Sequence, residues 1–180
     1  MIKTIYLVRH CQAFGKEQKA ELTEEGKEQA KELMYFFANR NVKRIVSSPF
    51  TRALQSVQPL ADNLELQLEI DDRLAEHRLI SNNLKDWLER LKESLQDLDL
   101  KLEGGESIGE VTKSAMELLE ETTDGTVLAT HRNIIGLILM QIKGMKGIKE
   151  WTDLSHPDVY EVLVKNDSYD VRRVWGKSEI

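Results

Sequence analysis

Two histidines follow apolar runs, and each could bring an imidazole to the edge of a sheet. Arg9 and His10 come directly after Ile5-Tyr6-Leu7-Val8. His131 comes after Val127-Leu128-Ala129-Thr130. Short β-branched and aromatic runs are typical of buried strands, and ligands of open α/β sheets bind beyond the carboxyl ends of such strands. An imidazole can act as a nucleophile and a guanidinium can hold two oxygens, so the pattern indicates an anionic substrate.

Arg52 and Glu76 carry charges that suit the same chemistry. Arg52 lies early in a predicted helix, where the helix dipole disfavours a cation unless an anion binds there. Glu76 lies in a predicted loop after a short strand. Two His, two Arg and one acid meet the needs of phosphoryl transfer, which are a nucleophile, positive charge on the phosphoryl oxygens and an acid for the leaving oxygen. Each of these residues taken alone could instead be an ordinary solvated side chain.

Other chemistries fit the sequence less well. It contains no Gly-rich phosphate loop of the Walker type, which argues against an NTPase. A metal centre stays open as an alternative, but the histidines show no i, i+4 pair and the paired arginines would repel a cation. The four histidines are His10, His77, His131 and His156.

Length, charge and cysteine content narrow the class of protein. A chain of 180 residues predicts one domain, residues 1–180. The single cysteine, Cys11, cannot form an internal disulfide, which fits a reducing compartment. The net charge of -6 argues against a nucleic-acid partner. We expect no signal peptide and no membrane span, and therefore a cytoplasmic protein.

Strand-like and helix-like segments alternate along the chain. This alternation predicts a three-layer α/β/α fold, with a mostly parallel sheet and helices on both faces. The predicted strands lie at about 5–8, 42–46, 66–70, 126–129, 160–164 and 170–174, the last two as an antiparallel edge. The predicted helices begin after Thr23, at about 50–63, within 83–104, after the capping box of Ser107 and Glu110, and at about 133–142. The helix within 83–104 could form a small inserted cap at about 77–105, or be an ordinary surface helix.

Six motifs, in order and across most of the chain, resemble the histidine phosphatase superfamily, also called the phosphoglycerate mutase-like family. They are Leu7-Val8-Arg9-His10, Leu22–Ala30, Ser47–Gln55, Leu74-Ala75-Glu76, Gly105-Glu106-Ser107 and Val127–His131. The resemblance implies a phosphomonoesterase that works through a phosphohistidine and needs no metal or cofactor. Its partner would be a phosphorylated small molecule or a phosphoprotein.

The resemblance also implies roles for five residues. His10 would be the nucleophile that carries the phosphoryl group. Arg9, Arg52 and His131 would bind the phosphoryl oxygens, and His131 would belong to the catalytic set. Glu76 would be the general acid for the leaving group and then the base that activates water.

The chain departs from the family pattern at three positions. Cys11 and Arg132 stand where the family usually has glycines after its two histidines, and Lys16 stands where it often has an asparagine. Together with Arg78, these residues are candidates to line the pocket, and Arg78 and Lys16 could favour an acidic substrate. The Cys11 thiol could have a lowered pKa beside the cations, or could be a small buried thiol that fills a gap.

Two other functions remain open. The mutases of this family are longer and carry larger insertions over the pocket, which keep water from the phosphoenzyme. The stretch from Glu76 to Gly105 is short, which favours hydrolysis over the transfer catalysed by a cofactor-dependent phosphoglycerate mutase. A degenerate, non-catalytic phospho-ligand binder is the second alternative, and Cys11 and Arg132 motivate it.

Overall fold

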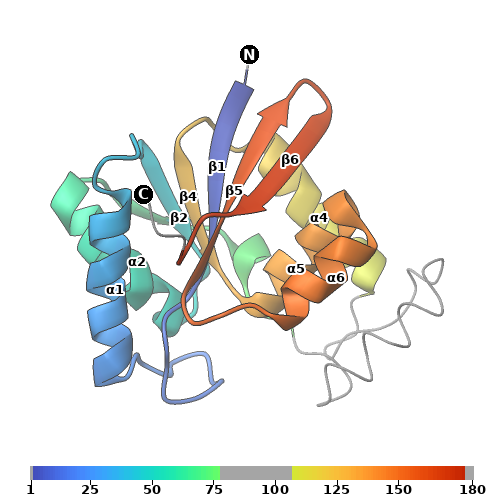
Figure 1. The fold of residues 1–180 in the computed structure, drawn as a ribbon. Helices are drawn as coiled ribbons and strands as arrows, with labels where there is room; N and C mark the ends of the chain where they lie inside the picture. The colour runs from blue at the N-terminus through green and yellow to red at the C-terminus, as the bar shows by residue number, and fades with distance from the viewer. Residues whose placement is uncertain (1, 78–106, 177–180) are drawn as a thin grey trace.

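The computed structural model of the protein describes residues 2–77 and 107–176. The strands form one six-stranded sheet in the order β3-β2-β4-β1-β5-β6. Figure 1 shows this sheet at the centre of the molecule. The first four strands of this order are parallel, whereas β5 runs antiparallel to β1 and β6 antiparallel to β5. The strands are β1 (Ile2–Arg9), β2 (Arg44–Ser47), β3 (Leu68–Ile70), β4 (Thr126–Thr130), β5 (Asp158–Lys165) and β6 (Ser168–Arg173).

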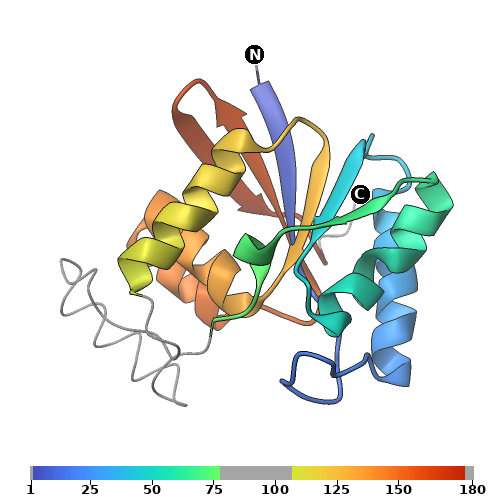
Figure 2. The same cartoon turned by 180° about the vertical axis from the view of Figure 1, so that it is seen from behind.

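Helices cover both faces of this sheet, as the opposite views of Figures 1 and 2 show. The helices α1 (Glu24–Phe37) and α2 (Thr51–Leu64) lie on one face. The helices α4 (Ile108–Glu121), α5 (Arg132–Lys143) and α6 (Met145–Thr152) lie on the other. The predicted three-layer α/β/α fold is therefore confirmed. No helix in the described ranges is both long enough and apolar enough to span a bilayer.

Successive residues of β1 supply the two cores. Ile5 and Leu7 belong to the core under α4, α5 and α6, whereas Tyr6 and Val8 belong to the core under α1 and α2. This is the alternation that a pleated strand imposes on its side chains. Because both faces of β1 are covered, its run is continuously apolar and ends at the polar pair Arg9 and His10.

The helix starts follow the capping signals in the sequence. The Thr23 hydroxyl accepts a hydrogen bond from the Gly26 backbone at 3.0 Å and starts α1. Ser107 and Glu110 form the predicted reciprocal capping box at the start of α4. Local side-chain chemistry therefore sets where these two helices begin.

The structure differs from the sequence prediction in one helix, one turn and the ends of several strands. The helix α6 was not predicted, because eight residues that include a glycine give only a weak periodic signal. A 3₁₀ turn, η1 (Asp72–Leu74), interrupts the loop predicted at 71–82, because the Asp71 carboxylate accepts from the Arg73 backbone. The strands β2 and β3 each begin two residues later than predicted. The predicted helix within 83–104, and the cap at about 77–105 beyond His77, lie outside the described residues.

The packing of α6 on α5 depends on a glycine. A Cβ added at Gly136 of α5 would overlap the indole ring of Trp151, which is fully buried in α6. We expect Gly136→Ala to lower the free energy of unfolding by roughly 1–3 kcal/mol, because overpacking a core forces side chains off their rotamers. Urea denaturation measures the change. Gln141→Ala, at an exposed position of the same helix, is the control, and an equal effect of the two substitutions would contradict the packing argument.

Candidate active site

The parallel pairing of β1 with β4 brings the two imidazoles together. Arg9 lies opposite Thr130 in the register of these strands, so the next residues, His10 and His131, leave the sheet side by side. Their ring centroids are 5.2 Å apart, and neither side chain is more than slightly exposed. The cluster lies at the carboxyl edge of the parallel strands, where open α/β sheets bind their ligands.

His10 has one protonated and one unprotonated ring nitrogen. Its Nδ1 lies 2.8 Å from the Cys11 carbonyl oxygen, which can only accept, so we assign the hydrogen to Nδ1. Its Nε2 accepts a hydrogen bond from Nε of Arg52 at 3.2 Å. Burial, together with the nearby cations of Arg52 and Arg9, lowers the pKa of His10 to about 3, although the hydrogen bond to the Cys11 carbonyl acts in the opposite direction. At neutral pH the ring is therefore uncharged, with its Nε2 lone pair directed at a guanidinium.

Arg52 lies in the first turn of α2, and the loop that follows β1 holds its side chain. Its Nη1 donates to the backbone carbonyls of Lys16 and Glu17 at 3.2 and 3.1 Å. The guanidinium is buried, and no side-chain hydrogen bond caps the start of α2. Lys16 thus contributes its carbonyl to the site, while its side chain is exposed.

Arg9 is held from the opposite side by the segment that precedes β5. Its Nη1 donates to the carbonyls of Leu154 and Ser155 at 2.9 and 3.3 Å. Its Nε is buried and has no hydrogen-bond partner within the described ranges. Burial, followed by the charge of Arg132, lowers the pKa of Arg9 to about 10, so the guanidinium stays charged at neutral pH.

A serine next to β2 sets the proton position on His131. The Ser48 hydroxyl accepts from the Phe50 backbone at 3.1 Å and lies 2.8 Å from Nε2 of His131. We assign its hydrogen to that bond, because the ring nitrogen is the acceptor within reach. Nδ1 then carries the hydrogen of the imidazole. Burial lowers the pKa of His131 to about 2, so the ring is neutral, and Nδ1 is buried without a hydrogen-bond partner.

Glu76 faces this unpartnered nitrogen. Its Oε2 lies 4.0 Å from Nδ1 of His131, and its Oε1 accepts from the His77 backbone at 3.0 Å. Burial raises the pKa of Glu76 to about 7, although the surrounding arginines act in the opposite direction. A carboxyl with such a pKa can hold a proton or release it near neutral pH.

The segment that carries Glu76 is tied to β4 and α5. Thr130 Oγ1 donates to the Leu74 carbonyl at 2.7 Å, and Asn133 Nδ2 donates to the His77 carbonyl at 2.6 Å. These bonds flank Glu76 on both sides. They fix its distance from His131, although more than fifty residues separate the two along the chain.

The remaining pocket-lining candidates have different positions. Cys11 is fully buried in the core under α1 and α2, and burial raises the pKa of its thiol to about 12. Of the two interpretations offered by the sequence, the structure therefore supports the small buried thiol. The Cys11 side chain does not line the site. Arg132 is half-buried at the start of α5, beside His131. Arg78 lies outside the described residues.

Two residues of the cluster were not singled out from the sequence. Ser48 was part of a motif, but its contact with His131 appears only when β2 lies beside β4. The His156 ring lies 5.5 Å from the His10 ring, because β5 pairs with β1 and returns the preceding segment to the same edge. A lone histidine in a loop carries no sequence signal for this position.

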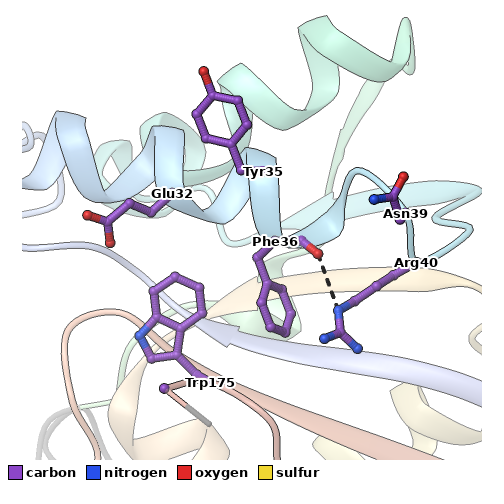
Figure 3. Close-up of a pocket in the computed structure, with 7 residues that line it drawn as sticks. Glu32, Tyr35, Phe36, Asn39, Arg40 and Trp175 are labelled. Carbon is purple, nitrogen blue, oxygen red and sulfur yellow. Dashed lines mark hydrogen bonds between the residues drawn. The ribbon is translucent and has the colours of Figure 1, made fainter. Parts of the chain in front are cut away.

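A surface groove lies apart from the cluster, beside α1 (Figure 3). The Phe36 and Trp175 rings meet edge to face there, and Arg40 donates from Nε to the Phe36 carbonyl. None of the residues that line this groove belongs to the cluster around His10. Among the described residues, no group of three or more His, Cys, Asp or Glu is arranged to hold a metal ion.

Comparisons with known proteins place the chain in a family. A family model for branch 1 of the histidine phosphatase superfamily matches residues 5–174. The chain belongs to this superfamily. The match extends from within β1 to the end of β6 and includes all five residues of the cluster that the sequence motifs named. A comparison with curated protein sequences gives no match.

Several solved structures share the fold of this chain at low sequence identity. A mycobacterial glucosyl-3-phosphoglycerate phosphatase is 21% identical, with a TM-score of 0.67 over 99% of this chain and 100% of that one. A phosphoserine phosphatase from Entamoeba histolytica is 20% identical, with a TM-score of 0.71 over 93% and 94%. A phosphoglycerate mutase from Bacillus anthracis str. Sterne is 17% identical, with a TM-score of 0.71 over 96% and 92%. At these identities the likeness establishes the fold.

The assigned proton position on His131 can be measured. In the wild-type protein at neutral pH, we expect side-chain ¹⁵N NMR signals of a neutral His131 ring protonated at Nδ1. Ser48→Ala removes the donor to Nε2, so we expect the Nε2-protonated tautomer to appear. Ser47→Ala is the matched control, because the Ser47 hydroxyl donates to the Ser48 carbonyl and should leave His131 unchanged. A wild-type ring protonated at Nε2 would contradict the assignment.

Proposed function

We propose that the protein is a phosphomonoesterase that hydrolyses a phosphorylated small molecule through a phosphohistidine on His10. One observation carries the proposal. The neutral His10 ring directs its Nε2 lone pair into a buried cluster of Arg9, Arg52 and the unpartnered Nδ1 of His131. A phosphoryl group placed there meets a nucleophile and positively charged donors at once.

The first step transfers the phosphoryl group to the enzyme. In the empty site, Nε of Arg52 donates to Nε2 of His10, so a phosphoryl oxygen must take over this hydrogen bond and free the lone pair. Nε2 then forms a bond to phosphorus while the bond from phosphorus to the ester oxygen breaks. Protonated Glu76 gives its proton to the departing oxygen, and Arg9 and Arg52 offset the charge on the equatorial oxygens.

The second step releases phosphate. Glu76, now ionised, takes a proton from water as the water oxygen attacks phosphorus and the bond to Nε2 breaks. His10 returns to its neutral form, and the proton on Glu76 restores the starting state. A carboxyl pKa near neutrality suits both halves of the cycle, because the group must donate in one and accept in the other.

The finer properties of this enzyme are also part of the proposal. Arg9 and Arg52 supply the positive charge that metal ions supply in other phosphoryl-transfer enzymes, so we propose metal-independent hydrolysis. A phosphomonoester needs Glu76 in its protonated form, so we propose an optimum on the acid side of neutrality. A single, buried free cysteine suits the reducing cytoplasm, where we place the protein.

Hydrolysis is favoured over the two alternatives. The stretch between Glu76 and Gly105 is short, which leaves little chain to exclude water from a phosphoenzyme. Total length does not separate the two activities, because the phosphoglycerate mutase from Bacillus anthracis is matched over 92% of its chain. The degenerate-binder alternative was motivated by Cys11 and Arg132, but the Cys11 side chain packs in the core and does not narrow the pocket. A direct assay separates the mutase from the phosphatase, because 3-phosphoglycerate primed with the bisphosphate is isomerised only by a mutase.

Phosphatase activity should depend on His10. We expect the wild-type protein to hydrolyse p-nitrophenyl phosphate without added metal, and His10→Ala to lower kcat at least roughly a thousandfold because no phosphoenzyme can form. Rapid quenching with labelled substrate should trap an acid-labile, alkali-stable phosphoprotein only in the wild type. A thermal melt of His10→Ala checks that it folds. Wild-type protein without turnover, or full activity in His10→Ala, would refute the proposal.

The acid role of Glu76 predicts a pH dependence. The protonated carboxyl is the active form for cleavage, so kcat/KM for an alkyl phosphate should fall as the pH rises through about 7. We expect Glu76→Gln to remove this limb and to lower kcat/KM for an alkyl phosphate by roughly 10²–10⁴. The loss should be much smaller with p-nitrophenyl phosphate, whose leaving group needs little protonation. Equal losses on the two substrates would contradict the assignment.

A further inference from the structure

Arg132 brings a third guanidinium to the site, and the proposed mechanism does not use it. It is the first residue of α5 and follows His131 directly. The side chain is half-buried, and its Nε is buried with no hydrogen-bond partner in the part of the chain that the structure describes. No ion pair between Arg132 and a carboxylate is found within the described residues. The requirements of the helix do not explain the residue, because a cation at the N-terminus opposes the helix dipole.

The charge of Arg132 affects the pKa of three groups in the cluster. Arg132 is the charged neighbour that lowers the pKa of Arg9 most. It also lowers the pKa of Glu76 and the pKa of His156. Geometry agrees with this: Arg132 lies between His131, whose ring is 5.2 Å from the His10 ring, and Asn133, whose Nδ2 donates to the His77 carbonyl next to Glu76, so the start of α5 lies at the edge of the cluster.

When a phosphomonoester is bound, its negative charge does not extend to balancing the positive charge of Arg132. A phosphomonoester carries nearly two negative charges at neutral pH, which Arg9 and Arg52 balance. Glu76 must be protonated when it serves as the acid, so it cannot pair with Arg132 at that stage. Burial and nearby cations hold the pKa of His156 at about 4, so His156 adds no charge. The Asp158 carboxylate also acts on Arg9, but it is paired with Arg173 at 2.8 Å. Among the described residues one positive charge therefore remains, and a half-buried cation without a counter-charge is unfavourable.

We propose that Arg132 binds a carboxylate of the substrate, so that the preferred substrate is a phosphomonoester with a carboxylate close to the ester. This inference rests on the proposed function and names its substrate class. A carboxylate supplies the single negative charge that is missing, whereas a second phosphate would bring an excess. The planar guanidinium can hold both carboxylate oxygens at once.

A pair of matched substrates tests this assignment. 3-Phosphoglycerate and glycerol 3-phosphate differ only in a carboxylate that replaces a hydroxymethyl group. We expect wild-type kcat/KM to favour 3-phosphoglycerate, and Arg132→Gln to lower kcat/KM for this substrate by roughly 10–100-fold, the range for a hydrogen bond between charged groups. For glycerol 3-phosphate the change should stay within about threefold.

Lys165→Gln is the control for loss of one positive charge. Lys165 is exposed and pairs with Ile2 at the opposite edge of the sheet, so its removal should leave the substrate preference unchanged. Thermal melts establish that each variant is folded. A wild-type enzyme that does not prefer 3-phosphoglycerate, or an Arg132→Gln variant that loses both substrates equally, would overturn the inference.

The test also separates this inference from the proposed function. If p-nitrophenyl phosphate is hydrolysed but the carboxylate gives no preference, the phosphatase stands and the carboxylate subsite fails. If no phosphomonoester is hydrolysed, the proposed function fails, and calorimetry with the same two ligands decides about the subsite. Tighter wild-type binding of 3-phosphoglycerate that Arg132→Gln removes would support the subsite, and equal binding of the two ligands would refute it.

Discussion

The parallel pairing of β1 with β4 is the interaction on which the site depends. It aligns Arg9 with Thr130, so that the two imidazoles leave adjacent strand ends at the same height. A slip of one residue would turn His10 and His131 toward opposite faces, because side chains alternate along a strand. The apolar cores on both faces of β1 oppose such a slip, since it would expose residues that are now buried.

Backbone carbonyl oxygens accept hydrogen bonds from the two buried guanidiniums, those of Arg9 and Arg52. Arg52 donates to the loop after β1, and Arg9 donates to the segment before β5. Carbonyl oxygens satisfy these donors without neutralising their charge, so the field at the centre of the cluster stays positive. That field and the burial together keep His10 and His131 uncharged. Positive charge and a free imidazole lone pair therefore coexist in the same small space.

The sequence predicted the three-layer fold, most of the described strands and helices, and five residues of the cluster, because each has a local signal. Apolar runs mark the strands, capping residues mark α1 and α4, and charged residues at strand ends stand out against them. The helix α6 was missed because its turns are few. The Cys11 thiol was left between two interpretations, since only packing decides whether a side chain next to a strand end points into the core or into a pocket.

The sequence by itself determined which chemical groups are present and at which strand ends they stand. Only the tertiary structure decided their protonation and their partners. The proton of His131 depends on Ser48, and the pKa of Glu76 depends on its burial. Likewise, His156 joins the cluster only because β5 returns antiparallel beside β1. The reason is physical: residue type and local pattern are carried along the chain, whereas desolvation and hydrogen bonding depend on neighbours that are distant in sequence.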